Sequence, residues 1–357
     1  NNNGTNFIEK EIINLNQNIE RLNNQKFEFQ QNLQLHNKYM NDKILVTGAA
    51  GFIGSHLSDA LSLLEINKLV LVDNMFLGQK KNLELTKKNN PNVKEYLDKK
   101  FSIAKYEVIE NIIDQEEIDI VFDLATIPLP ASLTDPKWCF EEITSMAVNL
   151  CELCRLGKFE TLIHCSTSEV YGTSEFVPMN EDHPWNSRTA YAAAKGASDL
   201  CIKSYVSTFE IDAVIIRPFN NYGPRQNDAN YAGVIPIFSN NLLNNDTCTI
   251  FGDGNQTRDF IYVTDTARGI IEIAESSYEK GEVINLASGK EVSIKELGEL
   301  LYKNKSKKFD PVFEEKRPGD VDRHLAGTQR LKDLTRFKPE VSIDEGLSST
   351  LDWYENK

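Results

Sequence analysis

The stretch that decides the fold is Lys43–Leu57, KILVTGAAGFIGSHL, in which an apolar run ends in a glycine cluster and continues directly into an amphipathic segment. This order of strand, glycine-rich turn and helix is typical of the first part of a dinucleotide-binding βαβ unit. We expect Gly48 to allow the tight turn, Gly51 to let the backbone approach a pyrophosphate, and Gly54 to let the helix pack close to the strand.

A second apolar run, Lys68–Asp73, supports this interpretation because it ends in an acid about twenty residues after the glycines. Beyond it, strands are expected at 69–73, about 99–104, 119–124, 160–165 and 211–217, with helices near 52–64, 107–116, 137–156 and 188–209. Alternation of this kind predicts an α/β fold, a doubly wound, mostly parallel Rossmann sheet.

The sequence pattern changes after Pro218, where the apolar segments become shorter and glycine and proline become frequent. We expect residues 42–217, completed by about 261–305, to form the dinucleotide-binding domain. Residues 218–357, especially 218–260 and 310–325, are expected to form most of a smaller, interleaved substrate-binding domain.

Residues 1–41 do not follow the α/β pattern and carry apolar residues alternately four and three apart. The seam is Ile8, Ile12, Leu15, Ile19, Leu22, Phe29 and Leu33, interrupted by Lys26 and His36. This spacing favours a coiled coil or helical hairpin over a weakly helical tail. Because Met40 resembles a natural start, we interpret the leader as an oligomerising extension or the end of a longer fusion.

The amino-acid composition argues against some classes of binding partner. The 53 acidic residues outnumber the 39 basic ones, giving a formal charge of −14, which argues against nucleic acid or an anionic membrane. No apolar run reaches membrane-spanning length. The six cysteines lie mostly in apolar patterns, which indicates reduced thiols and a cytoplasmic protein. The Cys151/Cys154 pair indicates packing, and the five histidines show no ligand spacing, so no metal site is expected.

A second sequence pattern indicates candidate catalytic residues. Tyr191 and Lys195 form Y-x-x-x-K, which places both side chains on one face of a helix. The Lys195 ammonium and a cationic nicotinamide would both favour a phenolate, so Tyr191 is a candidate general base toward a sugar hydroxyl. The segment CSTSEVYG at 165–172 follows a predicted strand and would supply a hydroxyl beside Tyr191.

Together these motifs resemble the extended short-chain dehydrogenase/reductase family, in particular its NAD-dependent nucleotide-sugar epimerases and dehydratases. The resemblance runs from about Met40 to the C-terminus. Its anchors are TGAAGFIGS at 47–55, STSEVYG at 166–172, YAAAK at 191–195, RPFNNYGPRQ at 217–226, YAGVIP at 231–236, FGDGNQTRDFIYV at 251–263 and RPGDV at 317–321.

The resemblance implies roles for individual residues. Asp73 would hold the adenosine ribose and repel a 2′-phosphate, so NAD is expected as the cofactor. Thr167 would hydrogen-bond the reacting sugar hydroxyl, Tyr191 would act as the base, and Lys195 would hold the nicotinamide ribose. The other implied cofactor contacts are Gly48, Gly51, Phe52, Ile53, Gly54, Asn74, Ser102, Ile103, Leu124, Ala125 and Thr126. The residues implied to bind the nucleotide diphosphate are Asn220, Arg258, Arg317 and Asp320. The substrate is also expected to contact Ser168 and Val234.

Three segments depart from the family pattern. Ser102 stands where an Asp usually contacts adenine. The helical pattern N-x-x-G-T-x-N keeps only Asn149, with Ile143 and Met146 at the first asparagine and the glycine. DLAT at 123–126 replaces the usual HLAA.

The choice of reaction rests on Ser168 and Glu169. Dehydratases of the family usually have T-D-E, whereas decarboxylases have T-S-E as here. The PRQ, YAGVIP and RPGDV segments look more like UDP-sugar 4-epimerases. We therefore expect a 4-epimerase acting through a 4-keto sugar, with Glu169 either catalytic or a pocket residue. The alternatives are a UDP-glucuronate-type decarboxylase, a 4,6-dehydratase, or a non-catalytic NAD-binding scaffold. A homodimer through the helices near 137–156 and 188–209 is expected, with the leader adding higher-order assembly.

Overall fold

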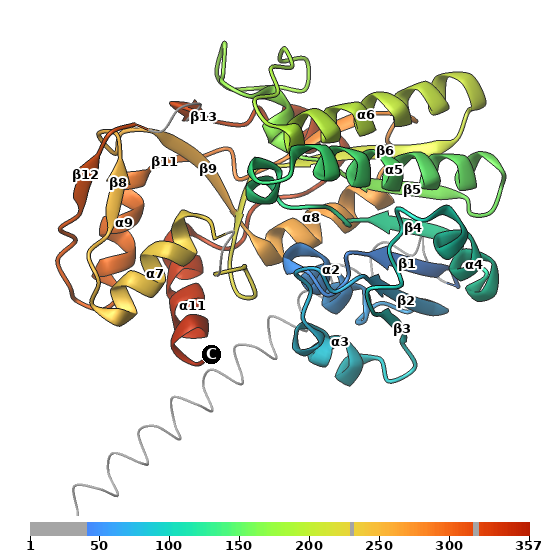
Figure 1. Cartoon of the computed structure of the whole chain (residues 1–357), viewed down its shortest axis with the longest axis horizontal. Helices are drawn as coiled ribbons and strands as arrows, with labels where there is room; N and C mark the ends of the chain where they lie inside the picture. The colour runs from blue at the N-terminus through green and yellow to red at the C-terminus, as the bar shows by residue number, and fades with distance from the viewer. Residues whose placement is uncertain (1–40, 229–231, 317–320) are drawn as a thin grey trace, which may run out of the picture.

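A parallel sheet of seven strands forms the centre of the larger part of the protein (Figure 1). The computed structural model describes residues 41–228, 232–316 and 321–357, so the predicted leader helix lies outside the described residues. Across the sheet the strands are β10 (Val283–Leu286), β6 (Asp212–Pro218), β5 (Thr161–Cys165), β4 (Ile120–Asp123), β1 (Lys43–Thr47), β2 (Lys68–Asp73) and β3 (Lys94–Leu97).

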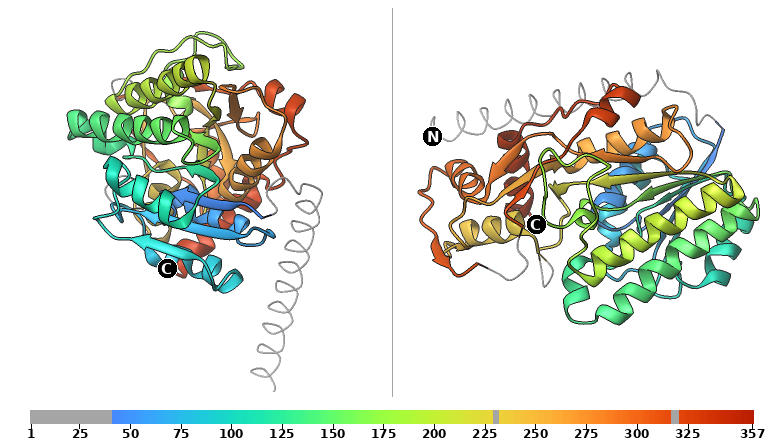
Figure 2. Two further views of the ribbon diagram at one scale, coloured as in Figure 1. Left: turned by 90° about the vertical axis from the view of Figure 1, so that its right-hand side faces the viewer. Right: turned by 90° about the horizontal axis from the view of Figure 1, so that it is seen from above.

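Helices cover both faces of this sheet (Figure 2). Alternate residues of a strand face opposite sides, so Ile44 packs in one apolar core while its neighbour Leu45 packs in the other. The first core lies against α2 (Phe52–Leu61) and α8 (Val263–Glu275), and the second against α4 (Tyr106–Glu116), α5 (Pro136–Arg155) and α6 (Ala190–Phe209). The predicted doubly wound Rossmann fold is confirmed.

One strand prediction is wrong. The third strand occupies Lys94–Leu97 and not 99–104. Among the described residues, β3 is an edge strand of the sheet and pairs with β2, and its first two residues are exposed. Because it is not buried on both faces, it lacks the continuous apolar run from which the inner strands were predicted. Ser102 and Ile103 consequently lie in the loop between β3 and α4.

The smaller part of the protein lies beyond the carboxyl ends of the sheet strands (Figure 1). It contains the sheet β11-β9-β13, with β7 pairing to β9, and the pair β12-β8. Its strands are β7 (Asn220–Tyr222), β8 (Thr249–Phe251), β9 (Thr257–Tyr262), β11 (Glu291–Ser293), β12 (Val312–Glu314) and β13 (Arg323–His324). Helices α7 (Val234–Asn244), α9 (Ile294–Lys303) and α11 (Ile343–Glu355) pack around a separate apolar core.

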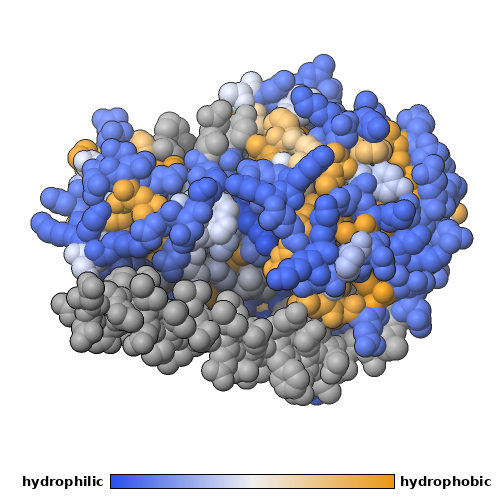
Figure 3. Space-filling view, turned by 90° about the horizontal axis from the view of Figure 1, so that it is seen from below, coloured by the Kyte–Doolittle hydropathy of each residue, from blue (hydrophilic) through white to orange (hydrophobic). Residues whose placement is uncertain are grey.

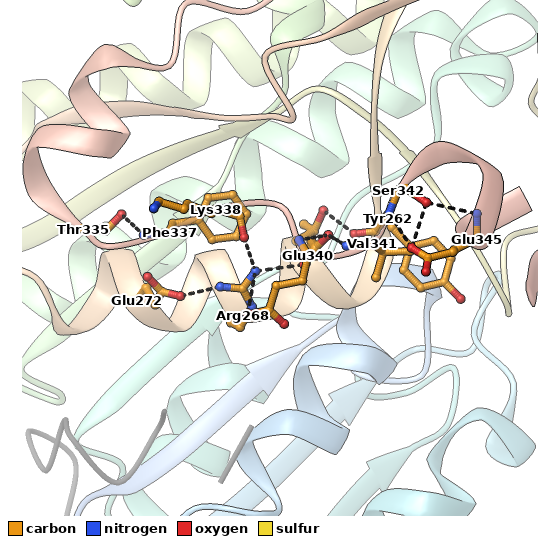
Figure 4. A network of polar contacts seen from close by, with 12 residues as sticks. Tyr262, Arg268, Glu272, Thr335, Phe337, Lys338, Glu340, Val341, Ser342 and Glu345 are labelled. Carbon is orange, nitrogen blue, oxygen red and sulfur yellow. Dashed lines mark hydrogen bonds and ion pairs between the residues drawn. The ribbon is translucent and has the colours of Figure 1, made fainter. Parts of the chain in front are cut away.

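The C-terminal segment is tied to α8 by a polar network (Figure 4). The Arg268 guanidinium donates to Asp265, to Glu272 and to the carbonyl oxygen of Lys338. Asp265 in turn accepts the backbone N–H of Glu340. A capping box of Ser342 and Glu345 then begins α11, which satisfies N–H groups that the first helical turn leaves without partners.

The remaining short helices complete the contacts around these parts. They are α3 (Glu84–Asn89), α10 (Gln329–Leu334) and the 3₁₀ turns at Lys80–Leu83, Leu129–Leu133 and Ser168–Tyr171. No helix within the described ranges is both long and apolar enough to cross a membrane. On the face shown in Figure 3, most coloured side chains are hydrophilic and the apolar ones form separate groups.

Candidate active site

A cavity of about 500 Å³ opens at the carboxyl ends of the sheet strands and is closed on one side by residues of the smaller part. Ligands of open α/β sheets bind at this edge. Most of the residues singled out from the sequence line it: Gly48, Gly51, Phe52, Ile53, Gly54, Asp73, Asn74, Ile103, Leu124, Ala125, Thr126, Thr167, Glu169, Tyr191, Lys195, Asn220 and Val234.

Two positions around the turn between β1 and α2, Gly48 and Gly54, require a residue without a side chain. Gly48 has a φ of +61°, and a Cβ there would come within 2.8 Å of the Leu124 carbonyl oxygen. A Cβ on Gly54 would collide with the carbonyl oxygen of Gly48. The turn is therefore a closely packed cradle of backbone at a helix N-terminus, the arrangement that binds a pyrophosphate.

Asp73 is fixed at the edge of this cradle. Its carboxylate accepts the backbone N–H of Ala50 at 3.0 Å and that of Met75 at 2.7 Å. Burial raises the pKa of Asp73, and these hydrogen bonds oppose the rise. The backbone N–H groups thus orient a carboxylate at the end of β2, where it lines the cavity.

The predicted base and its helical partner lie on the wall formed by α6 and the end of β5. Tyr191 is half-buried, and removal of its hydroxyl from bulk water raises the pKa of the phenol, while a hydrogen bond with Thr167 opposes that rise. The Lys195 ammonium is buried and donates to the Cys165 carbonyl oxygen at 2.7 Å. Two side chains predicted to act together therefore lie in one wall of the cavity, and the Lys195 ammonium has a fixed partner there.

A buried polar network under this wall was not expected from the sequence. Thr47 donates to Asp123 at 2.7 Å and accepts the backbone N–H groups of Leu124 and Ala125 at 3.1 Å each. Asp123 also pairs with His164 at 2.8 Å, across neighbouring strands. Burial alone would raise the pKa of Asp123, but the His164 contact and nearby charges hold it below its usual value.

The same network continues into α6. Asp199, one helical turn after Lys195, forms an ion pair with the fully buried Arg217 at 2.8 Å. The Arg217 guanidinium also lies over the rings of Tyr171 and Trp185, at 4.8 and 4.6 Å from their centroids. Each charge thus has an opposite charge or an aromatic face beside it, which a buried ion requires. Asp123 in the DLAT segment was the one sign of this buried network in the sequence, because a carboxylate at the end of a buried strand needs a partner.

A second cavity of about 420 Å³ adjoins the first, in the smaller part of the protein. The two share Asn220, Gly233, Val234 and Phe260. Arg258 lines the second cavity and donates to the carbonyl oxygens of Thr257 and Val321, at 2.9 and 2.7 Å. Of the predicted substrate residues, Asn220 and Val234 therefore line both cavities and Arg258 lines the second.

Two predicted residues within the described ranges, Ser168 and Ser102, line neither cavity, and two others lie outside those ranges. Ser168 is buried at the start of the 3₁₀ turn Ser168–Tyr171, outside the lining of both cavities. Ser102 lies in the loop after β3, outside the cavity lining. Arg317 and Asp320 lie outside the described residues.

Three comparisons agree with this geometry. Residues 44–287 match the model of the NAD dependent epimerase/dehydratase family. The chain is 32% identical to a UDP-glucose 4-epimerase of Mycolicibacterium smegmatis, over 88% of this chain and 99% of the relative. It is 31% identical to a UDP-N-acetyl-alpha-D-glucosaminuronate decarboxylase of Bacillus cytotoxicus, over 88% of this chain and 98% of that one.

A solved structure extends the likeness to three dimensions. The UDP-glucose 4-epimerase of Thermotoga maritima, crystallised with UDP-glucose, superimposes with a TM-score of 0.81 at 30% identity, covering 88% of this chain and 99% of that chain. The family match spans most of the protein, and the glycine cradle and Asp73 fit the dinucleotide. The chain therefore belongs to the NAD dependent epimerase/dehydratase family, among the extended short-chain dehydrogenases/reductases, and its cofactor is NAD.

Proposed function

We propose that this protein is a nucleotide-sugar 4-epimerase that acts on a UDP-sugar through a transient 4-keto intermediate. The observation that carries the proposal is that Thr167 and Tyr191 line the same cavity as the glycine cradle. It supports a base and a hydroxyl-binding residue that face the same sugar hydroxyl. The relatives named as UDP-glucose 4-epimerases add further support.

In this proposal, the cradle and Asp73 hold NAD, which when bound takes a hydride from C4 of the sugar and returns it. Thr167 orients the sugar 4-hydroxyl, and Tyr191 removes its proton, so that C4 becomes a ketone. The 4-keto sugar then rotates in the site. Tyr191 returns the proton to the ketone oxygen while C4 is reduced from its opposite face. The same phenol thus acts as base and then as acid, as microscopic reversibility demands.

Lys195 supports that exchange of a proton. Its ammonium is fixed by the Cys165 carbonyl oxygen, and a positive charge one helical turn from Tyr191 favours the phenolate form. Burial works against the phenolate. The cation therefore offsets part of the cost of ionising Tyr191 away from bulk water.

The nucleotide is assigned to the second cavity, with its diphosphate near the space shared by Asn220 and Val234. Arg258 suits this role because a guanidinium can pair with two phosphate oxygens at once. We assign the same role to Arg317, and we assign Asp320 to the binding of the nucleotide-sugar more generally. The NAD-binding domain is accordingly 42–217, completed by about 261–305, and the substrate-binding part is mainly 218–260 and 310–325.

The position of Ser168 favours epimerisation over dehydration. A 4,6-dehydratase needs a proton donor there, whereas the Ser168 hydroxyl is a weak acid in a buried residue outside the cavity lining. Decarboxylation of a UDP-uronate is the second candidate, because Glu169 lines the cavity and the T-S-E triplet is shared with such enzymes. In that reaction the 4-ketone would assist loss of the C6 carboxylate.

The exposed apolar surface and the amino-acid composition support proposals about the oligomeric state and the location of the protein. Phe140 and Val148 on α5 and Leu200 and Phe209 on α6 are exposed apolar side chains. Their burial between two copies supports a homodimer built on these helices. We assign higher-order assembly to residues 1–41, a cytoplasmic location to the protein, and neither nucleic acid nor a membrane as partner.

Product analysis of a panel of UDP-, GDP-, CDP- and dTDP-sugars tests the proposal. The expected result is a C4 epimer of unchanged mass, formed from a UDP-sugar and identified by NMR. A product lighter by water would instead indicate dehydration, and one lighter by carbon dioxide would indicate decarboxylation. Absence of any product with NAD present would leave the scaffold alternative.

A further inference from the structure

Glu142 of α5 is a carboxylate in the cofactor cavity that the reaction does not use. Its residue is half-buried and lines the cavity. Within the part of the chain that the structure describes, no hydrogen bond or ion pair of Glu142 is found. Its neighbour Glu141, by contrast, is exposed and pairs with Lys137 at 3.7 Å. A half-buried carboxylate that faces a binding cavity without a protein partner is suited to a ligand that donates a hydrogen bond.

The side of the cavity that Glu142 faces is fixed by its neighbours on α5. Trp138, one turn earlier, packs against Phe76 in the loop after β2, with ring centroids 5.3 Å apart. Asn149, two turns later, donates to the carbonyl oxygen of Ile103 in the loop after β3 at 3.0 Å. Positions 138, 142 and 149 share one helical face. Glu142 therefore faces the end of the sheet formed by β2 and β3.

This is the end of the cavity that receives the adenosine half of NAD. Asp73, the acid at the ribose position, ends β2, whereas Tyr191 and Lys195 lie at the other end, beside β5. A dinucleotide that spans the cradle places its adenine beyond Asp73, on the β3 side. Phe101 and Met146 line that end and supply apolar surface for the faces of a purine ring.

Among the described residues, three carboxylates line the cavity: Asp73, Glu142 and Glu169. Asp73 already accepts backbone N–H groups at the ribose position. Glu169 follows Thr167 and lies at the Tyr191 end. Glu142 is thus the carboxylate left to meet the edge of the adenine.

We propose that the Glu142 carboxylate accepts a hydrogen bond from the exocyclic amino group of the adenine of NAD, and so selects adenine over a 6-oxo purine. A carboxylate is an acceptor only, and the adenine amino group is a donor. In hypoxanthine a carbonyl oxygen replaces that amino group, so two acceptors would face each other. Loss of a charge-assisted hydrogen bond of this kind corresponds to about tenfold or more in affinity.

Competition between NAD and nicotinamide hypoxanthine dinucleotide tests this assignment without measuring turnover. The purified holoenzyme is equilibrated with an excess of both dinucleotides, from either starting complex, and the bound pair is quantified by mass spectrometry after gel filtration. Wild type should retain NAD in about tenfold or greater excess. E142A should lose most of that preference, to within about threefold. E142Q should also lose it, because its amide can donate to the 6-oxygen.

Glu141→Gln is the matched control, because it removes the adjacent exposed carboxylate and should keep the wild-type ratio. An unchanged ratio in both Glu142 variants would overturn the proposal, as would a wild type that binds both dinucleotides equally. Weaker binding of both dinucleotides at a constant ratio would place the carboxylate against a ribose or phosphate instead, and also counts against it. The experiment depends only on NAD binding, so a different sugar reaction would not affect its outcome.

Discussion

The Lys195 ammonium lies 2.7 Å from the carbonyl oxygen of Cys165, so a buried cation of α6 is fixed on the last residue of β5. This contact joins the helix that carries Tyr191 to the strand that leads into Thr167. In the proposed reaction, the placement of Tyr191 and Thr167 therefore depends on a lysine that need not touch the sugar.

Lys195→Met should lower kcat by about 10²-fold or more, since it removes the cation that favours the phenolate. Without that cation the pKa of Tyr191 rises, and the rate should recover part of its loss as the pH is raised. Steady-state kinetics from pH 7 to about 10.5 measure both effects, a range chosen around the ordinary tyrosine pKa of about 10. Lys203→Met, an exposed lysine on the same helix, is the control and should keep the wild-type profile.

Tyr191→Phe should reduce turnover by about 10²–10⁴-fold, the usual contribution of a general base. NAD should still bind, because Tyr191 lies on α6 whereas the glycine cradle lies between β1 and α2. Kinetics together with the bound-NAD content of the purified variant check both statements. Tyr205→Phe on α6 loses a hydroxyl that contacts Glu152 at 3.3 Å and should remain active. Near-normal activity of Tyr191→Phe would place the base elsewhere.

Glu169→Gln separates a pocket residue from an essential acid or base. We expect a pocket role, in which loss of one hydrogen bond to a charged group costs about 1–3 kcal/mol and acts mainly on KM. A collapse of kcat at constant KM would instead favour decarboxylation or dehydration. Glu175→Gln, in the exposed chain after the 3₁₀ turn, serves as the control.

Acid should destabilise the fold through two buried histidines. Burial and the charge of Arg225 lower the pKa of His56 to about 3, and burial and Arg258 lower that of His324 to about 4. Both histidines stay neutral in the folded protein while the unfolded chain takes up protons below about pH 6.5. Stability is thus fully present above that pH and falls as the pH drops toward about 4.

His56→Gln isolates one of these contributions. Glutamine can still donate to the Pro224 carbonyl oxygen that His56 contacts at 3.0 Å. Between pH 6 and 4.5 the free energy of unfolding of the variant should fall less steeply than that of wild type, by about 1.4 kcal/mol per pH unit. Urea unfolding at several pH values measures the slopes, and parallel slopes would contradict the assignment.

The sequence was informative where function depends on residues close together in the chain. The turn around Gly48 needs residues without a Cβ, and the spacing of Tyr191 and Lys195 needs only a helix, so both positions were predicted without knowledge of the tertiary fold. The inner strands were also predicted, because burial on both faces demands a continuous apolar run.

Features that depend on register or on rotation about a helix were missed. The contact of His164 with Asp123 requires that β4 and β5 pair at those residues. The edge strand β3 carried too few apolar residues to be located correctly. Glu142 was also missed, because its direction is set by the packing of Trp138 and Asn149 against separate loops.

The fate of the hydrogen on C4 tests the central claim most directly. A UDP-hexose carrying deuterium at C4 is incubated with the enzyme, and its product is examined by NMR and mass spectrometry. The account predicts that deuterium stays at C4 with inverted configuration and unchanged mass, since the hydride removed from C4 returns to C4. Deuterium at C6 in a product that has lost water, or loss of carbon dioxide from the corresponding UDP-uronate, would contradict it.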